Sequence, residues 1–173
     1  NPNGKGSTVN NQVITMQENK NNPVGNTFTT FAPSVTTTFS FSNQQFSLPV
    51  GHVSTGTGLS FGTSNNSSNV AAVAADIYPT LNAIGSPSNN MFTALSTLTS
   101  GTGIDVSANR GVEIFTSARA LYNEGKSTSG RHYFGDITLT FSKPVSNPVL
   151  HIVGLGGYFT SSGNMLGFTS ELE

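Results

Sequence analysis

The stretch YFGDITLTFSKPVSNPVLHIVGLGGY, residues 133–158, holds the clearest alternation of side-chain character in the chain. Ile137, Leu139 and Phe141 fall on one face of an extended segment, and hydroxyl-bearing residues fall on the other. A period of two is typical of a half-buried β-strand, so a strand is predicted over residues 137–142.

The second half of this stretch predicts another strand. Pro144 and Pro148 interrupt the first strand, because proline has no N–H to donate to a ladder. The apolar segment VLHIV, residues 149–153, is expected to resume as a second strand. The glycine-rich GLGG that follows, residues 154–157, is expected to end it.

The same alternation recurs upstream, where Val35, Thr37, Phe39 and Phe41 share one face of a predicted strand over residues 35–41. Shorter strand candidates cover residues 13–16, 27–31, 46–50, 59–61, the first half of 112–121, 158–160 and 165–169.

Two segments in the middle of the chain have helical character instead. Residues 70–78 are rich in alanine, which favours helix, and they stop at Pro79. Residues 88–98 begin with capping residues and carry apolar side chains at helical spacing. Short strands with one or two short helices inserted around residues 65–100 predict a mainly β fold. We expect a jelly-roll-like β-sandwich.

The amino-acid composition limits which kinds of protein this chain can be and which partners it can bind. The chain has 173 residues, enough for one domain with a core. Only 9% of its residues are charged, the net charge is −1, and Ser, Thr and Asn take the place of charges. With no basic run, a nucleic-acid partner is not expected. With no cysteine, disulfides and thiolate metal sites are excluded. No apolar run reaches the ~18 residues of a membrane span, so no membrane insertion is expected.

We therefore expect a single extracellular domain over residues 1–171. Residues 1–12 are rich in Asn and Gly and are expected to be flexible. Leu172 and Glu173 have the character of a cloning remnant and are left out of the fold prediction. The sequence begins at Asn1 without a signal peptide, which is typical of a mature or excised piece.

Part of the opening stretch, GDITLTFSKPVSNPVLHIVGLGG, resembles the jelly-roll-like β-sandwich modules of large bacterial surface or adhesin-like proteins. The resemblance covers roughly residues 134–157. It implies a secreted or cell-surface location and a non-catalytic role in adhesion or in recognition of a glycan or protein ligand. Such modules often carry acidic residues after the second strand. This chain has GLGG there, which weakens the case for calcium at that loop.

Two functions of other classes stay open. One is a structural or assembly module of a surface layer or capsid-like array, which packs against neighbouring domains and needs no ligand pocket. The other is a carbohydrate-binding module of a secreted glycoside hydrolase.

The candidate ligand-binding residues are aromatic side chains and hydrogen-bond donors at loop edges, because sugar sites combine aromatic faces with a few polar groups. They are Tyr122, Arg131, His132, Tyr133 and Tyr158. The alternative is that these tyrosines lie at strand ends with buried rings. Recognition is expected in flanking loops, over residues 99–111 and 122–133.

Catalytic and metal signals are sparse. The chain has no G-x-S-x-G elbow, its three histidines lack metal-ligand spacing, and Glu113 is the best single acid for glycoside hydrolysis. We expect no enzyme activity and no cofactor. Calcium at the loop-edge acids Asp105 and Asp136 is kept as a candidate, against a turn-forming role for both.

Overall fold

The computed structural model describes residues 8–20, 27–46, 58–62, 76–81, 109–116, 118–127, 129–161 and 164–173; of residues 19, 118, 119, 157–161 and 164–168 it describes the backbone. The elements in chain order are β1 (Gln12–Thr15), β2 (Gln17–Asn19), β3 (Phe28–Thr30), β4 (Thr36–Ser42), β5 (Leu59–Phe61), β6 (Ile114–Thr116), α1 (Ala118–Asn123), β7 (Asp136–Phe141), β8 (Gly156–Ser161) and β9 (Asn164–Thr169). The fold is mainly β, as predicted, and its ladders are antiparallel.

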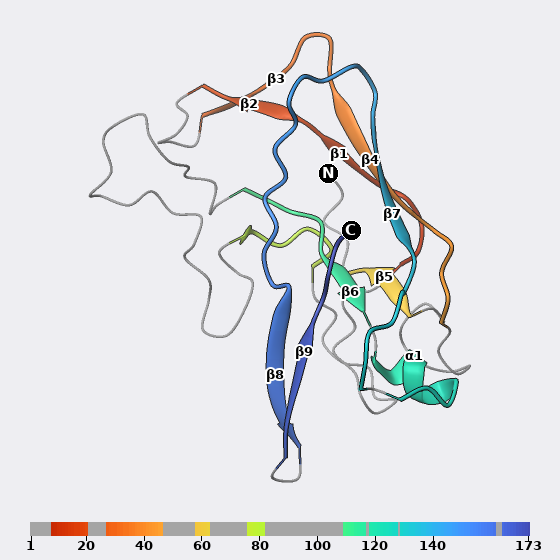
Figure 1. Cartoon of the computed structure of the whole chain (residues 1–173). Coiled ribbons are helices and arrows are strands. Elements are labelled where there is room, and N and C mark those ends of the chain that lie inside the picture. The colour runs from red at the N-terminus through yellow and green to blue at the C-terminus, as the bar shows by residue number, and fades with distance from the viewer. Residues whose placement is uncertain are drawn as a thin grey trace.

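A three-stranded sheet with the order β1-β4-β7 forms one side of the molecule (Figure 1). Its register places Phe39 opposite Leu139 and Phe41 opposite Ile137. Paired residues point to the same face, so the apolar alternations of β4 and β7 combine into one apolar face. The strands predicted over residues 35–41 and 137–142 are thereby confirmed.

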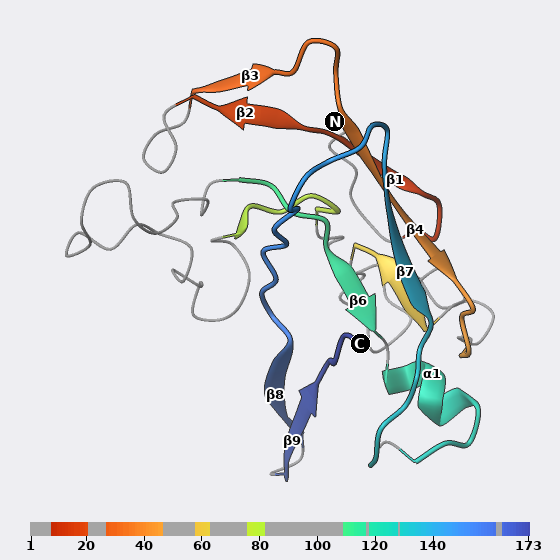
Figure 2. The same cartoon turned by 45° about the horizontal axis from the view of Figure 1, so that its top comes forward.

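Three two-stranded ladders accompany this sheet: β2-β3, β5-β6 and β8-β9. β2 and β3 continue the pairing of β1 with β4, and Met16 N donates to Val35 O at 2.8 Å between the two ladders. The β8-β9 hairpin extends away from the other strands in both ribbon views (Figure 2). It confirms the two strands predicted near the end of the chain.

The core lies behind the apolar face of the large sheet. Phe61 of β5 is fully buried and stacks on Phe41 of β4, with ring centroids 3.8 Å apart. Ile77 and Tyr78 complete this cluster. The buried Tyr78 hydroxyl donates to Gln12 Oε1 at 2.7 Å, which satisfies two polar groups that would otherwise be costly to bury.

The strand predicted over residues 149–153 is wrong. These residues form no strand in the structure, and β8 begins within the glycine-rich segment that was expected to end a strand. Val149 is 75% exposed and Leu150 is 59% exposed. The apolar, β-branched composition favours an extended backbone, but a strand also needs a partner, and residues 149–153 have no ladder among the described residues.

The helix predicted over residues 70–78 is wrong for the part that the structure describes. Residues 76–78 are not helical, and Ile77 O accepts a hydrogen bond from Glu113 N at 3.0 Å. Residues 70–75 and the helix predicted over 88–98 lie outside the described residues. Within the stretch 1–12, expected to be flexible, Thr8 exchanges two backbone hydrogen bonds with Phe61 and Gln12 begins β1. Among the described residues, no helix is long and apolar enough to span a membrane.

Candidate functional site

The antiparallel pairing of β4 with β7 brings two distant segments together at one end of the sheet. Ser42, the last residue of β4, lies opposite Asp136, the first residue of β7. The chain that leaves β4 therefore runs beside the chain that enters β7, and Gln45 N donates to Phe134 O at 3.1 Å. Side chains from both segments face the same region of the surface.

A hollow of about 540 Å³ opens at this place. Its lining combines three aromatic rings, one of them an imidazole, with charged and amide side chains from three parts of the sequence. The lining residues are Gln45, Phe46, Glu124, Lys126, Arg131, His132 and Tyr133.

The turn after α1 supplies two of these residues. Gly125 adopts a left-handed backbone with φ of 65°, and its N–H donates to Tyr122 O at 3.1 Å. Lys126 N then donates to Leu121 O at 2.9 Å. This pair of hydrogen bonds is the Schellman arrangement that ends many helices at glycine. It fixes the backbone from which Glu124 and Lys126 reach the hollow.

Phe46 forms the apolar part of the hollow. Its ring lies edge-on to Phe134, with centroids 5.0 Å apart, and edge-on to His132, with centroids 6.0 Å apart. The His132 ring is also held by a polar contact, because Nε2 lies 2.7 Å from Ser127 O. The aromatic wall is therefore positioned by contacts that exist before any ligand arrives.

Tyr133 and Asp136 form a hydrogen-bonded pair beside the hollow. The Tyr133 hydroxyl donates to Asp136 Oδ1 at 2.5 Å, and Asn43 Nδ2 donates to Asp136 Oδ2 at 2.6 Å. The hydrogen bond from Tyr133, and then that from Asn43, lower the pKa of Asp136. The same hydrogen bond to Asp136 raises the pKa of the Tyr133 phenol. The Tyr133 ring remains exposed to solvent.

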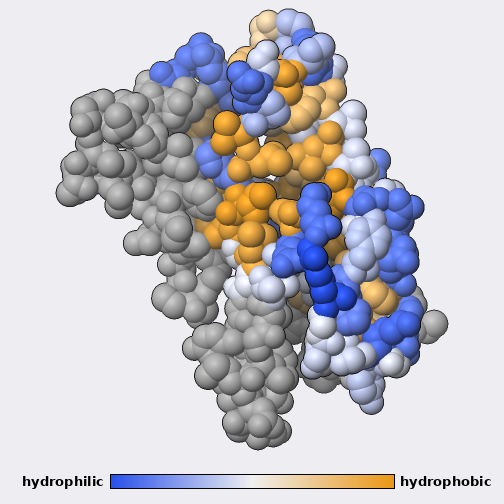
Figure 3. All heavy atoms as spheres, in the orientation of Figure 1, coloured by the Kyte–Doolittle hydropathy of each residue, from blue (hydrophilic) through white to orange (hydrophobic). Residues whose placement is uncertain are grey.

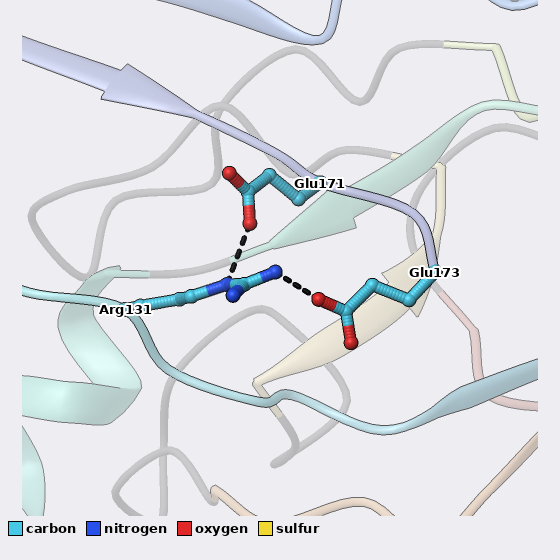
Figure 4. Close-up of polar contacts among 3 residues, drawn as sticks. All are labelled: Arg131, Glu171 and Glu173. Atoms are coloured by element: carbon cyan, nitrogen blue, oxygen red, sulfur yellow. Dashed lines mark hydrogen bonds and ion pairs between the residues drawn. The ribbon is translucent and has the colours of Figure 1, made fainter.

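Arg131 is held by the end of the chain. Its guanidinium lies between the carboxylates of Glu171 and Glu173, both of which follow β9 (Figure 4). The Arg131 Nε to Glu171 Oε2 distance is 2.6 Å. All three side chains are largely exposed, so these ion pairs orient Arg131 more than they stabilise the fold.

Three of the predicted ligand-binding residues therefore line one hollow: Arg131, His132 and Tyr133. Tyr122 lies on α1, exposed and outside the lining of the hollow. Tyr158 lies in β8, and its side chain is outside the described residues.

Sequence reasoning missed four residues of the lining: Gln45, Phe46, Glu124 and Lys126. Glu124 and Lys126 fall within the loop predicted to carry recognition, over residues 122–133. Gln45 and Phe46 reach the site only through the register of β4 with β7. Of the other predicted loop, residues 99–111, the structure describes 109–111 alone.

Of the two acids considered for calcium, the structure describes only Asp136. Asp105 lies outside the described residues, and both carboxylate oxygens of Asp136 accept side-chain hydrogen bonds. No group of three or more His, Asp or Glu side chains suited to a metal ion is found in the described part of the chain. Calcium binding stays a prediction from the sequence.

Glu113 lies away from the hollow, immediately before β6, and is partly buried. Burial raises its pKa, and the negative charge of Asp76 raises it further. This is the environment of a carboxylic acid that keeps its proton more readily than usual.

Comparison of the chain with protein-family models, with curated protein sequences and with solved structures finds no significant match.

Proposed function

We propose that this chain is a non-catalytic recognition module that binds a carbohydrate in the hollow beside Tyr133, as an extracellular part of a bacterial surface protein. The observation that carries the proposal is the convergence of Phe46, His132 and Tyr133 with amide and charged side chains around about 540 Å³. Ligand sites generally occupy about 300–1,000 Å³ and combine apolar walls with a few polar groups.

The chemistry of the lining suits a sugar. An exposed Tyr133 ring offers a flat face to the C–H groups of a pyranose ring, as aromatic residues do at sites that are apolar on one side and wet on the other. Gln45, Lys126 and Arg131 are hydrogen-bond donors for hydroxyl groups, and Glu124 is an acceptor. Pre-set contacts around His132 and Arg131 reduce the side-chain entropy that binding would otherwise cost.

The extracellular part of the proposal rests on the sequence. The chain has few charges and is rich in Ser, Thr and Asn, and residues 134–157 resemble adhesin-like modules. We also propose that the antiparallel ladders belong to a jelly-roll-like sandwich, the architecture of those modules.

A glycan array followed by calorimetry tests the proposal. Tyr133→Ala is expected to weaken binding of a glycan found on the array by about tenfold, or about 1.4 kcal/mol, because the stacking face is lost. Tyr133→Phe keeps the ring but removes the hydrogen bond to Asp136, and is expected to retain most of the affinity.

Tyr122→Ala is the matched control, since Tyr122 is an exposed tyrosine outside the hollow. It should leave the affinity unchanged. A folded sample that binds no glycan, or equal losses for Tyr122→Ala and Tyr133→Ala, would contradict binding at this hollow.

A further inference from the structure

The connection between β7 and β8 carries an exposed apolar segment, VLHIV, residues 149–153. In Figure 1 this connection crosses the molecule as a long segment without regular secondary structure. Figure 3 shows apolar side chains gathered on the same face. Val149 is 75% exposed, Leu150 59% and Ile152 46%. Exposed apolar residues in such a group mark sites of interaction with a protein, a membrane or a ligand.

The backbones of Leu150 and Ile152, the residues whose groups the pairing below uses, are available. Among the described residues, no hydrogen bond is found to the backbone of Leu150 or Ile152. Residues 144–170 also contain no Asp, Glu, Lys or Arg. Natural sheet edges are commonly protected from pairing by charged side chains, especially lysine. This segment has strand-forming composition without that protection.

The sequence VLHIV is nearly the same when read in either direction. In an antiparallel pair of two such segments, a two-fold axis at His151 places Val149 opposite the partner's Val153. The same axis places Leu150 opposite the partner's Ile152. A two-fold interface requires a surface that is complementary to itself, and matched aliphatic pairs without any charge provide it.

We propose that a second copy of this chain pairs with the first through residues 149–153, antiparallel and centred on His151. In the register we assign, His151 forms a non-hydrogen-bonded pair with the partner's His151. Leu150 and Ile152 then exchange backbone hydrogen bonds with the partner's Ile152 and Leu150. This register uses no backbone group of His151.

Both ends of the seam are fixed by the sequence. Pro148 has no N–H for a further ladder bond, and Gly154 turns the chain away with a φ of 77°. A seam of five residues is short, so the dimer is a weak one that depends on concentration.

Cross-linking tests the register, because the chain contains no cysteine of its own. In His151→Cys the two introduced thiols face each other across the axis. Non-hydrogen-bonded partners have Cα atoms about 4.5 Å apart, within the range of a disulfide. With an added oxidant, which removes two electrons and two protons, His151→Cys is expected to form covalent dimer about tenfold faster than Val145→Cys. Val145 is 41% exposed on the same connection but lies outside the seam.

Sedimentation velocity over a concentration series tests the seam without cysteine. Ile152→Lys puts a cation opposite the partner's Leu150 twice per dimer and is expected to raise the dissociation constant about tenfold or more. Val145→Lys adds the same charge outside the seam and should leave the constant unchanged, with circular dichroism comparing the folding of both variants.

A chain that stays monomeric at about 1 mM overturns the proposal. Equal cross-linking rates for His151→Cys and Val145→Cys also overturn it, since they would show random collision. If the segment instead pairs with a strand of a different protein, the chain alone will be monomeric in both experiments, which rejects self-pairing.

Discussion

At the scale of a single residue, Glu113 is expected to make the stability of the fold depend on pH. Its pKa is raised by burial and then by the charge of Asp76. An acid whose pKa is higher in the folded state than in the unfolded state favours folding while it is protonated. That contribution is lost as the pH rises from the ordinary value of about 4.3 through the folded value.

Glu113→Gln should therefore increase thermal stability at pH 7, because the amide carries no charge to bury. The increase should shrink as the pH falls, and it should vanish below about pH 4, where Glu113 is protonated in both states. Thermal unfolding followed by circular dichroism across this range measures it. Glu124→Gln, at an exposed acid, is the control and should change little. An equal gain at every pH would contradict the account.

Single residues also show how far the site was predictable. Arg131, His132 and Tyr133 are adjacent in sequence, so one local pattern of aromatic rings and donors identified all three. Gln45 and Phe46 lie more than eighty positions away and join them because Ser42 pairs with Asp136. The signal that could have found them was the pairing itself: two alternating strands in antiparallel register bring the exit of one beside the entry of the other.

At the scale of elements, the two strands with the clearest alternation, β4 and β7, were predicted correctly, whereas the strand predicted over residues 149–153 was wrong. In β4 and β7 the residues alternate, so that one face of each strand is apolar and the other carries hydroxyl groups. Residues 149–153 are apolar almost throughout. This pattern indicates a preference for extended backbone, but it does not indicate which strand would pair with the segment. A ladder depends on what lies opposite, which local composition does not encode.

The contact between Gly58 and Phe46, a residue that lines the hollow, gives a prediction about the start of β5. Gly58 precedes β5, and its N–H donates to Phe46 O at 2.7 Å. A Cβ at this position would lie 3.1 Å from Phe46 Cβ, 3.2 Å from Ala120 Cβ and 3.3 Å from Phe134 Cδ1. Gly58 therefore lets three segments pack closely against the start of β5: the chain after β4, α1 and the entry to β7.

Gly58→Val is expected to reduce the free energy of unfolding by about 1–3 kcal/mol, because the added methyl groups overpack this junction. Gly58→Ala should cost less, in proportion to its smaller volume. Urea unfolding of both variants measures the series. A valine variant as stable as the glycine protein would show that the junction has spare room.

At the scale of the whole molecule, the small number of charged residues affects the association of two copies of the chain. The net charge is −1 and only 9% of residues are charged, so long-range repulsion between copies is weak. Association through residues 149–153 would bury aliphatic side chains and backbone groups but no ion.

The proposed dimer should therefore be insensitive to moderate salt. Raising NaCl from about 0.05 M to about 0.5 M shortens the Debye length severalfold, yet it should change the dissociation constant by less than about twofold. Analytical ultracentrifugation at both concentrations measures this. A steep loss of dimer with salt would point to ion pairs, such as those of Arg131, in place of the aliphatic seam.

The hydrogen bond from Tyr133 to Asp136 gives the molecule an optical reporter. The chain has four tyrosines and no tryptophan, so its ultraviolet emission comes from tyrosine alone. A carboxylate that accepts a hydrogen bond from the phenol quenches tyrosine emission, so Tyr133 is expected to be dim while this bond persists. A sugar that breaks this hydrogen bond on binding is expected to brighten Tyr133 over the background of the other three tyrosines, Tyr78, Tyr122 and Tyr158. Occupancy of the hollow is then readable from unlabelled protein.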